Sequence, residues 1–283
     1  QILKLNPSFP SFSDGITARY SKHKGRHIVA TRDIRPGELI AADKAYSTCN
    51  ILDDEDVVHT ICCVCLARTP TPLPCPQCTM VVFCSESCKS SGLSDFHETE
   101  CSLLTTVAAL GVPHFAEVLR ILTKTTFNII RKRFRALQIE REVKSPDLLG
   151  FNQASVYDSS SYETVYHLVG NLQERSVLDI IKSCSEAYII IDLLRQCDKF
   201  FTNENGQIQS PSKDDLIIAG SACLTHLLST FCNSFELGEY LVNVDDIEDY
   251  SLTNIGRGTF PSLALLNHSC NPSAMILSYG TTN

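Results

Sequence analysis

The sequence has no excess of basic residues and no long apolar run. Lysine and arginine number 24 against 32 aspartate and glutamate residues, which gives a formal net charge of −8 at pH 7. Sequence-independent nucleic-acid binding needs a basic surface that displaces phosphate counterions, so we expect no strong direct nucleic-acid binding. The longest apolar stretch, Ala187 to Leu194, contains Asp192 and is far shorter than the roughly 20 residues that cross a bilayer. We therefore expect no membrane span and no membrane partner.

The chain also lacks the features of a secreted, disulfide-rich domain. It opens with QILKLNPSFP, which has neither the basic nor the apolar region of a signal peptide. Eight of its 14 cysteines lie between residues 62 and 101, and the other six are scattered singly. Disulfide-dense domains carry cysteines throughout and occur in oxidising compartments, so this distribution predicts a reducing location, the cytoplasm or the nucleus.

The clustered cysteines come in pairs with the spacing of metal ligands. Three Cys–Cys pairs and one His–Cys pair are each separated by two or three residues, and their alternation suggests two interleaved sets of four. The first set is Cys62, Cys65, Cys84 and Cys88, and the second is Cys75, Cys78, His97 and Cys101. Such sets are typical of structural zinc, whereas a redox CxxC usually comes alone and buried cysteines need no regular spacing. We therefore predict two closed zinc sites, with Cys63 left over.

This cysteine-rich segment has little else to hold it together. It has four prolines between residues 70 and 76 and spans only 40 residues, too few to bury a hydrophobic core. Metal binding must then supply its folding energy, on the order of 10 kcal/mol per site. Its spacing, C-x2-C-x9-C-x2-C-x5-C-x3-C-x8-H-x3-C, resembles a MYND zinc finger. The resemblance implies either a docking surface for proline-containing peptides or a rigid insert, and the sequence does not choose between them.

Secondary-structure signals change along the chain from strands to helices and back. Short β-rich runs lie at Ile16 to Tyr20, Arg26 to Ala30 and Leu39 to Ala41. After the cysteine-rich segment, apolar residues recur at helical spacing with a break at Pro113, and Tyr162 to Phe201 also has a helical period. The last segment returns to glycine, proline and β-type residues. Strands on both sides of a helical block predict an α+β fold in which one β-rich domain surrounds insertions.

Two stretches in the strand segments carry a second resemblance. LLNHSCNP, Leu265 to Pro272, is ordinary loop composition when taken alone, because Asn, Ser and Pro are turn formers. The longer run GTFPSLALLNHSCNP resembles the NHSC core of SET-domain protein-lysine methyltransferases, and KHKGRHIVATRDIRPGELI resembles the N-terminal SET hairpin. A SET domain split by a MYND finger is the pattern of the SMYD family. The residues of these motifs are most similar to those of the subgroup with an N-terminal helical-repeat extension.

The resemblance implies a β-rich SET domain interrupted by a MYND zinc finger and a helical insert. The expected segments are residues 15–49 for the N-terminal part of the SET domain, 50–101 for the finger, 102–230 for the helical insert and 231–283 for the core SET strands with NHSC. The match is weak over 102–230. The family's later strand, its catalytic tyrosine and its post-SET cysteines are expected beyond Asn283, so we expect the chain to be a fragment that is inactive alone.

For function, the resemblance implies an S-adenosylmethionine-dependent protein-lysine N-methyltransferase acting on a histone or non-histone protein. The matching cofactor positions are Lys22, His23, Lys24, Asn233, Asn267 and His268, with Tyr166 and His167 added from the helical block. Phe235 matches the wall of the lysine channel, and Cys270 matches the first ligand of a third zinc in the post-SET region. The residue types suit these roles, because glycine at 25 permits a sharp turn and an asparagine amide both donates and accepts.

Several of these residues also have an ordinary explanation. Lys22 and Lys24 are typical solvated charges, and FCNSF, which holds Asn233 and Phe235, is a normal end for an apolar helix. A second class of function therefore stays open, a non-catalytic zinc-finger adaptor or transcriptional co-regulator that binds proteins through the MYND surface. A GEE-type strand followed by a tyrosine and a Cys-x-Cys-x2-Cys cluster beyond Asn283 would favour the enzyme.

Overall fold

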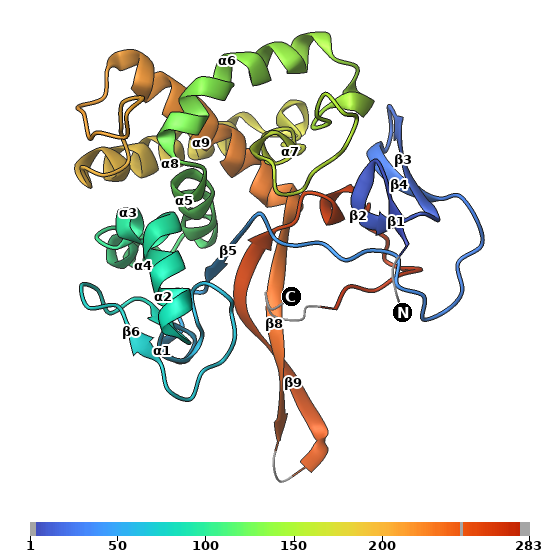
Figure 1. Cartoon of the computed structure of the whole chain (residues 1–283), viewed down its shortest axis with the longest axis horizontal. Helices are drawn as coiled ribbons and strands as arrows, with labels where there is room; N and C mark the ends of the chain where they lie inside the picture. Colours follow the sequence, from blue (N-terminus) through green and yellow to red (C-terminus); the bar gives the residue numbers. More distant parts are fainter. Residues whose placement is uncertain (1–3, 244–245, 278–283) are drawn as a thin grey trace.

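Residues 4–243 and 246–277 are described in the computed structural model of the chain, shown in Figure 1. Short strands form the N-terminal part, to the right in that view. They are β1 (Leu5–Asn6), β2 (Phe9–Ser13), β3 (Ile16–Ser21) and β4 (Gly25–Ala30). β3 and β4 form an antiparallel hairpin in which Ile16 faces Ala30 and Ser21 faces Gly25, so the first two strand predictions are confirmed.

The predicted strand at Leu39–Ala41 is wrong. The chain makes only an isolated bridge there, between Phe12 and Ala41, together with a hydrogen bond from Ser13 N to Ile40 O at 2.9 Å. Ile40 and Ala41 are partly buried against a small core that contains Phe12. Their apolar character therefore reflects packing on β2, and the segment leaves β2 before a ladder of hydrogen bonds can form.

A three-stranded sheet joins distant parts of the sequence. Its strands are β5 (Ser47–Asn50), β9 (Asp246–Thr259) and β8 (Ser234–Asn243), in that order and antiparallel. Ser47 lies opposite Thr259, so the segment before the finger pairs with the segment after the helices. The expected α+β fold, with a β-rich domain around insertions, is confirmed. β8 and β9 also extend as a long hairpin away from the rest of the chain (Figure 1).

The finger consists of short elements between its ligand pairs. They are α1 (Glu55–Thr60), β6 (Leu73–Pro74), β7 (Val82–Phe83), α2 (Glu86–Gly92), the π-helical η1 (Leu93–His97) and α3 (Glu98–Glu100). Side-chain caps start two of the helices: Asp54 accepts from the backbone of α1, and Ser85 accepts from Cys88 N in α2. Such caps satisfy the free N–H groups of a first helical turn, which fixes where each short helix begins.

Helices dominate the block between the finger and β8. They are α4 (Leu104–Leu110), α5 (Pro113–Thr125), α6 (Phe127–Val143), η2 (Pro146–Leu148), α7 (Tyr162–Tyr166), η3 (Leu172–Glu174), α8 (Val177–Gln196) and α9 (Lys213–Asn233). The helical period expected at Tyr162–Phe201 is present as two helices, α7 and α8, because the chain leaves helical geometry after Tyr166 and passes through left-handed backbone at Asn171. Ser176 then caps α8 by accepting from Asp179 N at 3.1 Å.

The largest core runs from the finger into the helical block. Phe83 and Phe96 of the finger are buried in one cluster with Phe115, Leu119 and Phe127 of the helices. The finger therefore shares a hydrophobic core with α5 and α6. This agrees with the expectation that so short a segment has no sufficient core of its own.

α9 is the longest apolar helix among the described residues. By length and composition alone it could cross a membrane, since its mean hydropathy over 18 residues is 1.4. In the fold it packs against α5, α6 and α8, and half of that window is buried. A helix that is apolar on several sides is typical of a core position, and α9 fills that position here.

Candidate metal centres and cofactor site

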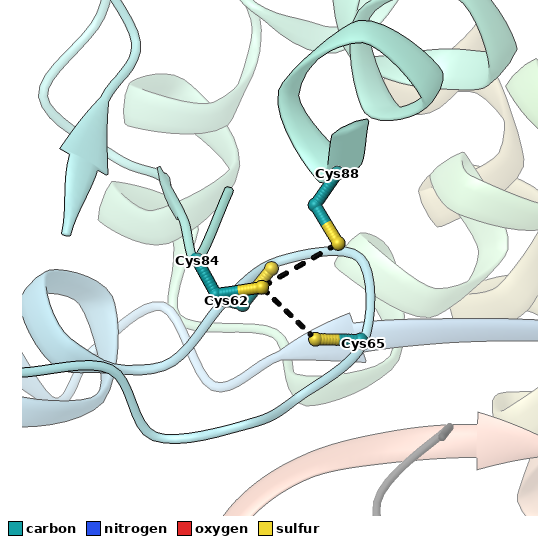
Figure 2. A group of neighbouring side chains, drawn as sticks. All are labelled: Cys62, Cys65, Cys84 and Cys88. Carbon is teal, nitrogen blue, oxygen red and sulfur yellow. Dashed lines mark hydrogen bonds between the residues drawn. The ribbon is translucent and has the colours of Figure 1, made fainter. Parts of the chain in front are cut away.

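The first predicted ligand set converges in space. The Sγ atoms of Cys62, Cys65, Cys84 and Cys88 all lie within 4.8 Å of one another. Figure 2 shows the four sulfurs meeting between two loops of the finger and the start of α2. Two Sγ–Sγ distances, from Cys84 to Cys65 and to Cys88, are both 3.5 Å. Zinc–sulfur bonds of about 2.3 Å in a tetrahedron place neighbouring sulfurs about 3.8 Å apart, so the arrangement fits one zinc ion.

The second predicted set forms a separate and more buried group. Ligand atoms of Cys75, Cys78, His97 and Cys101 again lie within 4.8 Å of one another. The Sγ atoms of Cys75 and Cys101 are 3.8 Å apart, and Cys78 Sγ is 3.6 Å from Nε2 of His97. Burial lowers the pKa of His97 to about 4, so the imidazole is neutral and one ring nitrogen has a free lone pair for a metal. Three thiols and one imidazole are a typical structural zinc set.

Local backbone geometry explains why the two cysteines of each of these pairs lie close together. Leu66 N donates to Cys62 O at 2.9 Å, and Leu66 has a φ of 56°, so the chain turns sharply after the first pair. Cys84 and Cys88 lie on either side of the Ser85 cap, which brings a thiol before α2 next to a thiol in its first turn. Cys63 belongs to neither group and is buried, and only its backbone takes part in the network described next.

A buried arginine connects the finger to the rest of the domain. Arg120 Nε of α5 donates to both carboxylate oxygens of Glu100, at 2.9 and 3.0 Å, and its Nη1 donates to Thr48 O at 2.6 Å and Cys63 O at 3.3 Å. The guanidinium lies 3.6 Å from the ring centroid of Phe96. Arg120 and Glu100 are 4% and 1% exposed. One side chain thus joins α5, β5 and both ends of the finger, and no pattern in the sequence identifies it.

Two of the predicted cofactor positions, one near each end of the chain, meet in the structure. Asn267 Nδ2 donates to Lys24 O at 3.0 Å, across 243 positions of sequence. Lys24 lies in the turn between β3 and β4, and Lys22, His23 and Lys24 are exposed, as are Asn267 and His268. Gly25 has a φ of +63°, a left-handed conformation that an L side chain rarely adopts, and no atom lies within 4 Å of where its Cβ would be. The turn is therefore open to a ligand.

Arg26 fixes this turn against the helical block, although it was not among the predicted site residues. Its guanidinium donates to Leu149 O at 2.7 Å and also to His167 O. His167 therefore contributes its backbone at this point. Its buried ring faces away, with Nε2 3.2 Å from Glu140, and that burial lowers the pKa of His167 to about 4. Arg26 could have been found from the sequence, since it directly follows Gly25 in the hairpin stretch.

Tyr166 is also buried in the helical block. Arg141 lies over its ring at 4.4 Å from the centroid, and the ring of His226 is 6.3 Å away. Burial raises the pKa of Tyr166 and lowers that of His226 to about 3, so both side chains are neutral near pH 7. Tyr166 and the ring of His167 are thus buried in the helical block, whereas the predicted positions at residues 22–24, 267 and 268 are exposed.

Asn233 and Phe235 lie where α9 passes into β8. The Asn233 amide donates to Val169 O and to Ser229 O, both at 2.7 Å, so this buried side chain ties α9 to the segment that Arg26 also holds. Phe235 is half-buried, and its ring meets Phe260 edge-on at 5.6 Å and 85°. Together they form an aromatic pair beside the junction.

Glycine at 258 makes room for this aromatic pair. Phe235 faces Gly258 across the β8–β9 ladder. A Cβ at Gly258 would lie 2.8 Å from Cε2 of Phe260, closer than real Cβ atoms approach a neighbour. The ring of Phe260 therefore covers a position that only glycine leaves free.

Cys270 is exposed and lies beside another predicted residue. Its Sγ is 3.3 Å from Nε2 of His268. No further cysteine or histidine joins these two in a metal group within residues 4–243 and 246–277. The predicted third zinc thus has one matching ligand here, and residues 278–283 of the expected 231–283 segment lie outside the described residues.

Comparisons with known proteins give the finger and its context a family. Residues 62–101 match the family description of the MYND finger. The chain is 24% identical over 296 residues to "Protein-lysine N-methyltransferase SMYD4" of Danio rerio, covering 93% of this chain and 39% of that protein. It is 25% identical over 254 residues to "Histone-lysine N-methyltransferase ASHR1" of Arabidopsis thaliana, covering 90% and 42%. The chain is thus similar along most of its length to SET and MYND domain-containing (SMYD) proteins.

These matches confirm the resemblance to the SMYD family given by the sequence motifs. A third relative, "N-lysine methyltransferase SMYD2-A" of Xenopus laevis, is 26% identical over 269 residues, covering 95% of this chain and 50% of that protein. The chain thus spans half or less of the length of these three curated relatives. The matches cover nearly all of this chain, so the helical block and the strands belong to the same relationship as the finger. The boundaries of the four segments stay predictions.

Proposed function

We propose that the protein containing this chain is an S-adenosylmethionine-dependent protein-lysine N-methyltransferase. The observation that carries the proposal is the hydrogen bond from Asn267 to Lys24 O, which brings the NHSC segment against the glycine turn of the N-terminal hairpin. Relatives over almost the whole chain are named lysine methyltransferases, which supports the same reading. The protein substrate, histone or non-histone, is proposed with it.

The chemistry of the clustered groups suits this cofactor. S-adenosylmethionine supplies a methyl group on a sulfonium centre, together with an amino-acid end and an adenosine end rich in hydrogen-bonding atoms. The open turn at Gly25 offers backbone N–H and C=O groups, and the exposed Asn267 amide both donates and accepts. Lys22, His23, Lys24 and His268 are exposed beside them, so the group is accessible to a ligand. We propose that these residues hold the cofactor, with Asn233 closing the site from α9.

Phe235 and Phe260 are proposed to receive the target lysine. Methyl transfer is a direct in-line displacement, so positioning of the amine supplies most of the rate. The ammonium must lose a proton before it attacks, and an aromatic wall that excludes water lowers the pKa of the bound lysine. The edge-on pair is partly buried and lies next to Asn233, which supports this assignment. The catalytic tyrosine is proposed to lie beyond Asn283.

The finger is proposed to be a stable zinc module that contacts other proteins. Its two ligand groups fit zinc, and it shares a core with α5 and α6, which supports a rigid platform. Proline-containing peptides are the proposed ligands of its surface, and a third zinc that includes Cys270 is proposed for the post-SET region. A reducing compartment, cytoplasm or nucleus, is proposed because the eight ligand residues need reduced thiols.

The test is radiolabelled methyl transfer with the longest reading frame that contains this chain. We expect label from S-adenosylmethionine to appear on lysines of proteins in a cell lysate, and Asn267→Ala to reduce it strongly. The 283-residue chain in the same assay should give little or no transfer, because the expected tyrosine is not part of it. Absence of transfer by the longer protein, with unaltered binding of proline-containing peptides, would favour the adaptor. Equal turnover by both proteins would show that the active site is misplaced.

A further inference from the structure

Glu117 is a buried carboxylate that no part of the proposed chemistry uses. It lies on α5, is 0% exposed, and has no ion-pair partner among the described residues. Each of its carboxylate oxygens nevertheless accepts a hydrogen bond. Ser234 Oγ donates to Oε2 at 2.7 Å, and Thr259 Oγ1 donates to Oε1 at 2.8 Å. A buried carboxylate is costly unless its lone pairs are satisfied, so this arrangement depends on both hydroxyls.

The two hydroxyls belong to one cross-strand pair. Ser234 is the first residue of β8 and Thr259 is the last residue of β9, and they face each other in the ladder. Glu117 therefore bonds both strands at the base of the long hairpin, at the end that joins the rest of the domain. Thr259 O also accepts from Tyr46 N at 2.8 Å, which ties the same point to the segment before β5.

Both residues directly precede the proposed lysine-channel rings. Phe235 follows Ser234, and Phe260 follows Thr259. The two rings meet at 5.6 Å, so a shift of either strand end would move one ring against the other. We propose that Glu117 is a positioning residue that holds the Phe235–Phe260 pair in register for lysine methylation. This inference rests on the proposed function, since it concerns the geometry of that same site.

Asn233 has anchors that do not depend on Glu117. Its amide is already held by Val169 O and Ser229 O, both at 2.7 Å. Loss of the carboxylate should therefore disturb the aromatic pair more than the cofactor contacts. The inference thus makes a specific kinetic prediction: the methyl-transfer step is impaired while cofactor affinity is nearly kept.

The experiment uses Glu117→Ala, Glu117→Gln and Thr259→Val in the longest reading frame. Glutamine keeps the volume and one acceptor oxygen, and valine replaces only the hydroxyl of Thr259 by a methyl group, so both variants should fold and bind zinc. For Glu117→Ala we expect kcat to fall at least about tenfold while the Kd for S-adenosylmethionine changes less than about threefold, since misplacement by about 1 Å has large effects on rate. Glu117→Gln should recover part of kcat.

Glu186→Gln is the matched control, because Glu186 is another buried carboxylate, on α8, and its ion-pair partner among the described residues is Lys182 of the same helix, at 3.8 Å. Its kcat and Kd should match those of the wild type. Parallel losses of kcat, cofactor affinity and melting temperature in Glu117→Ala would overturn the inference, because they indicate a purely structural role. Unchanged kcat in Glu117→Ala would also overturn it.

A second measurement does not need activity. Hydrogen exchange of the 283-residue chain should become faster in Glu117→Ala at residues 234–237 and 257–260, and stay unchanged there in Glu186→Gln. If the wild-type longer protein transfers no methyl group but this local change is seen, the role of Glu117 in holding the base of the hairpin is supported and the proposed function fails. If the wild type is active and neither exchange nor kcat responds to Glu117→Ala, the proposed role of Glu117 is wrong and the proposed function stands.

Discussion

Replacing Arg120 by methionine should weaken the attachment of the finger to the rest of the domain and lower the stability of the protein. The substitution removes the donor to Glu100, Thr48 O and Cys63 O, and leaves the Glu100 carboxylate buried at 1% exposure. Thr123 Oγ1, which donates to Glu100 Oε1 at 2.6 Å, would be its remaining side-chain partner. An unbranched methionine can still fill the space over Phe96. The stability lost in Arg120→Met therefore comes mainly from the missing ion pair and hydrogen bonds.

The expected size of the effect follows from the asymmetry of buried ion pairs. Removing one partner from such a pair costs about 3–5 kcal/mol, because the other charge stays buried without compensation. A typical domain has only about 5–15 kcal/mol of stability, so the free energy of unfolding of Arg120→Met should fall by a large fraction. The double variant Arg120→Met with Glu100→Gln should lose less than half as much, since the amide oxygen still accepts from Thr123 and no charge is stranded.

Urea unfolding followed by circular dichroism in excess zinc measures this, together with the rate at which a chelator removes zinc. Glu100 lies directly before the ligand Cys101, so we expect faster zinc release in Arg120→Met. Arg195→Met is the control, because Arg195 pairs with Asp192 on the exposed face of α8 and should leave the midpoint unchanged. An Arg120→Met protein with wild-type stability and zinc release would refute the idea that this arginine joins the finger to α5 and β5.

Three further predictions concern zinc, cofactor and pH. Elemental analysis should find two zinc ions per chain, and Cys84→Ser should lose zinc while Cys63→Ser, which removes no ligand, keeps it; equal loss in both would contradict the pairing. In the longest reading frame, calorimetry should show Asn267→Ala weakening S-adenosylmethionine binding by about 1–3 kcal/mol and Lys22→Ala doing less, because the backbone is the proposed ligand there; equal effects would count against it. Burial lowers the pKa of His226 to about 3, so its contribution to stability is present above its unfolded pKa of about 6.5 and is lost as pH falls towards 3. His226→Phe should remove about 2 kcal/mol of the stability change between pH 7 and pH 5, measured by urea unfolding at both pH values, and an unaltered pH dependence would argue against a buried neutral imidazole.

The zinc ligands were accessible from the sequence because metal pairs are local. Cys62 and Cys65, like Cys84 and Cys88, are joined by one tight turn or one helical turn, so their spacing already reports the geometry. The β3–β4 hairpin was predictable for the same reason, since its strands follow each other around Gly25. The strand expected at Leu39–Ala41 failed where the outcome depended on the distance to β2, which is a tertiary property.

Family resemblance extended the sequence reading to the cofactor positions, but it did not show how they are held. Arg26, for example, lies within the quoted hairpin, yet its role depends on the carbonyls of Leu149 and His167, which are more than 100 residues away. Lys24 and Asn267 likewise became neighbours only through the fold.

The sequence by itself thus determined two zinc sites, a hairpin with a glycine turn and an α+β order of segments, because each depends on residues close together in the chain or on local propensity. Only the tertiary structure decided that Arg120 links the finger to α5, and that Glu117 joins Ser234 to Thr259. The physical reason is that a buried charge has no periodic signature. It is stable only where distant segments bring it enough hydrogen-bond partners, and those partners become visible when the chain is folded.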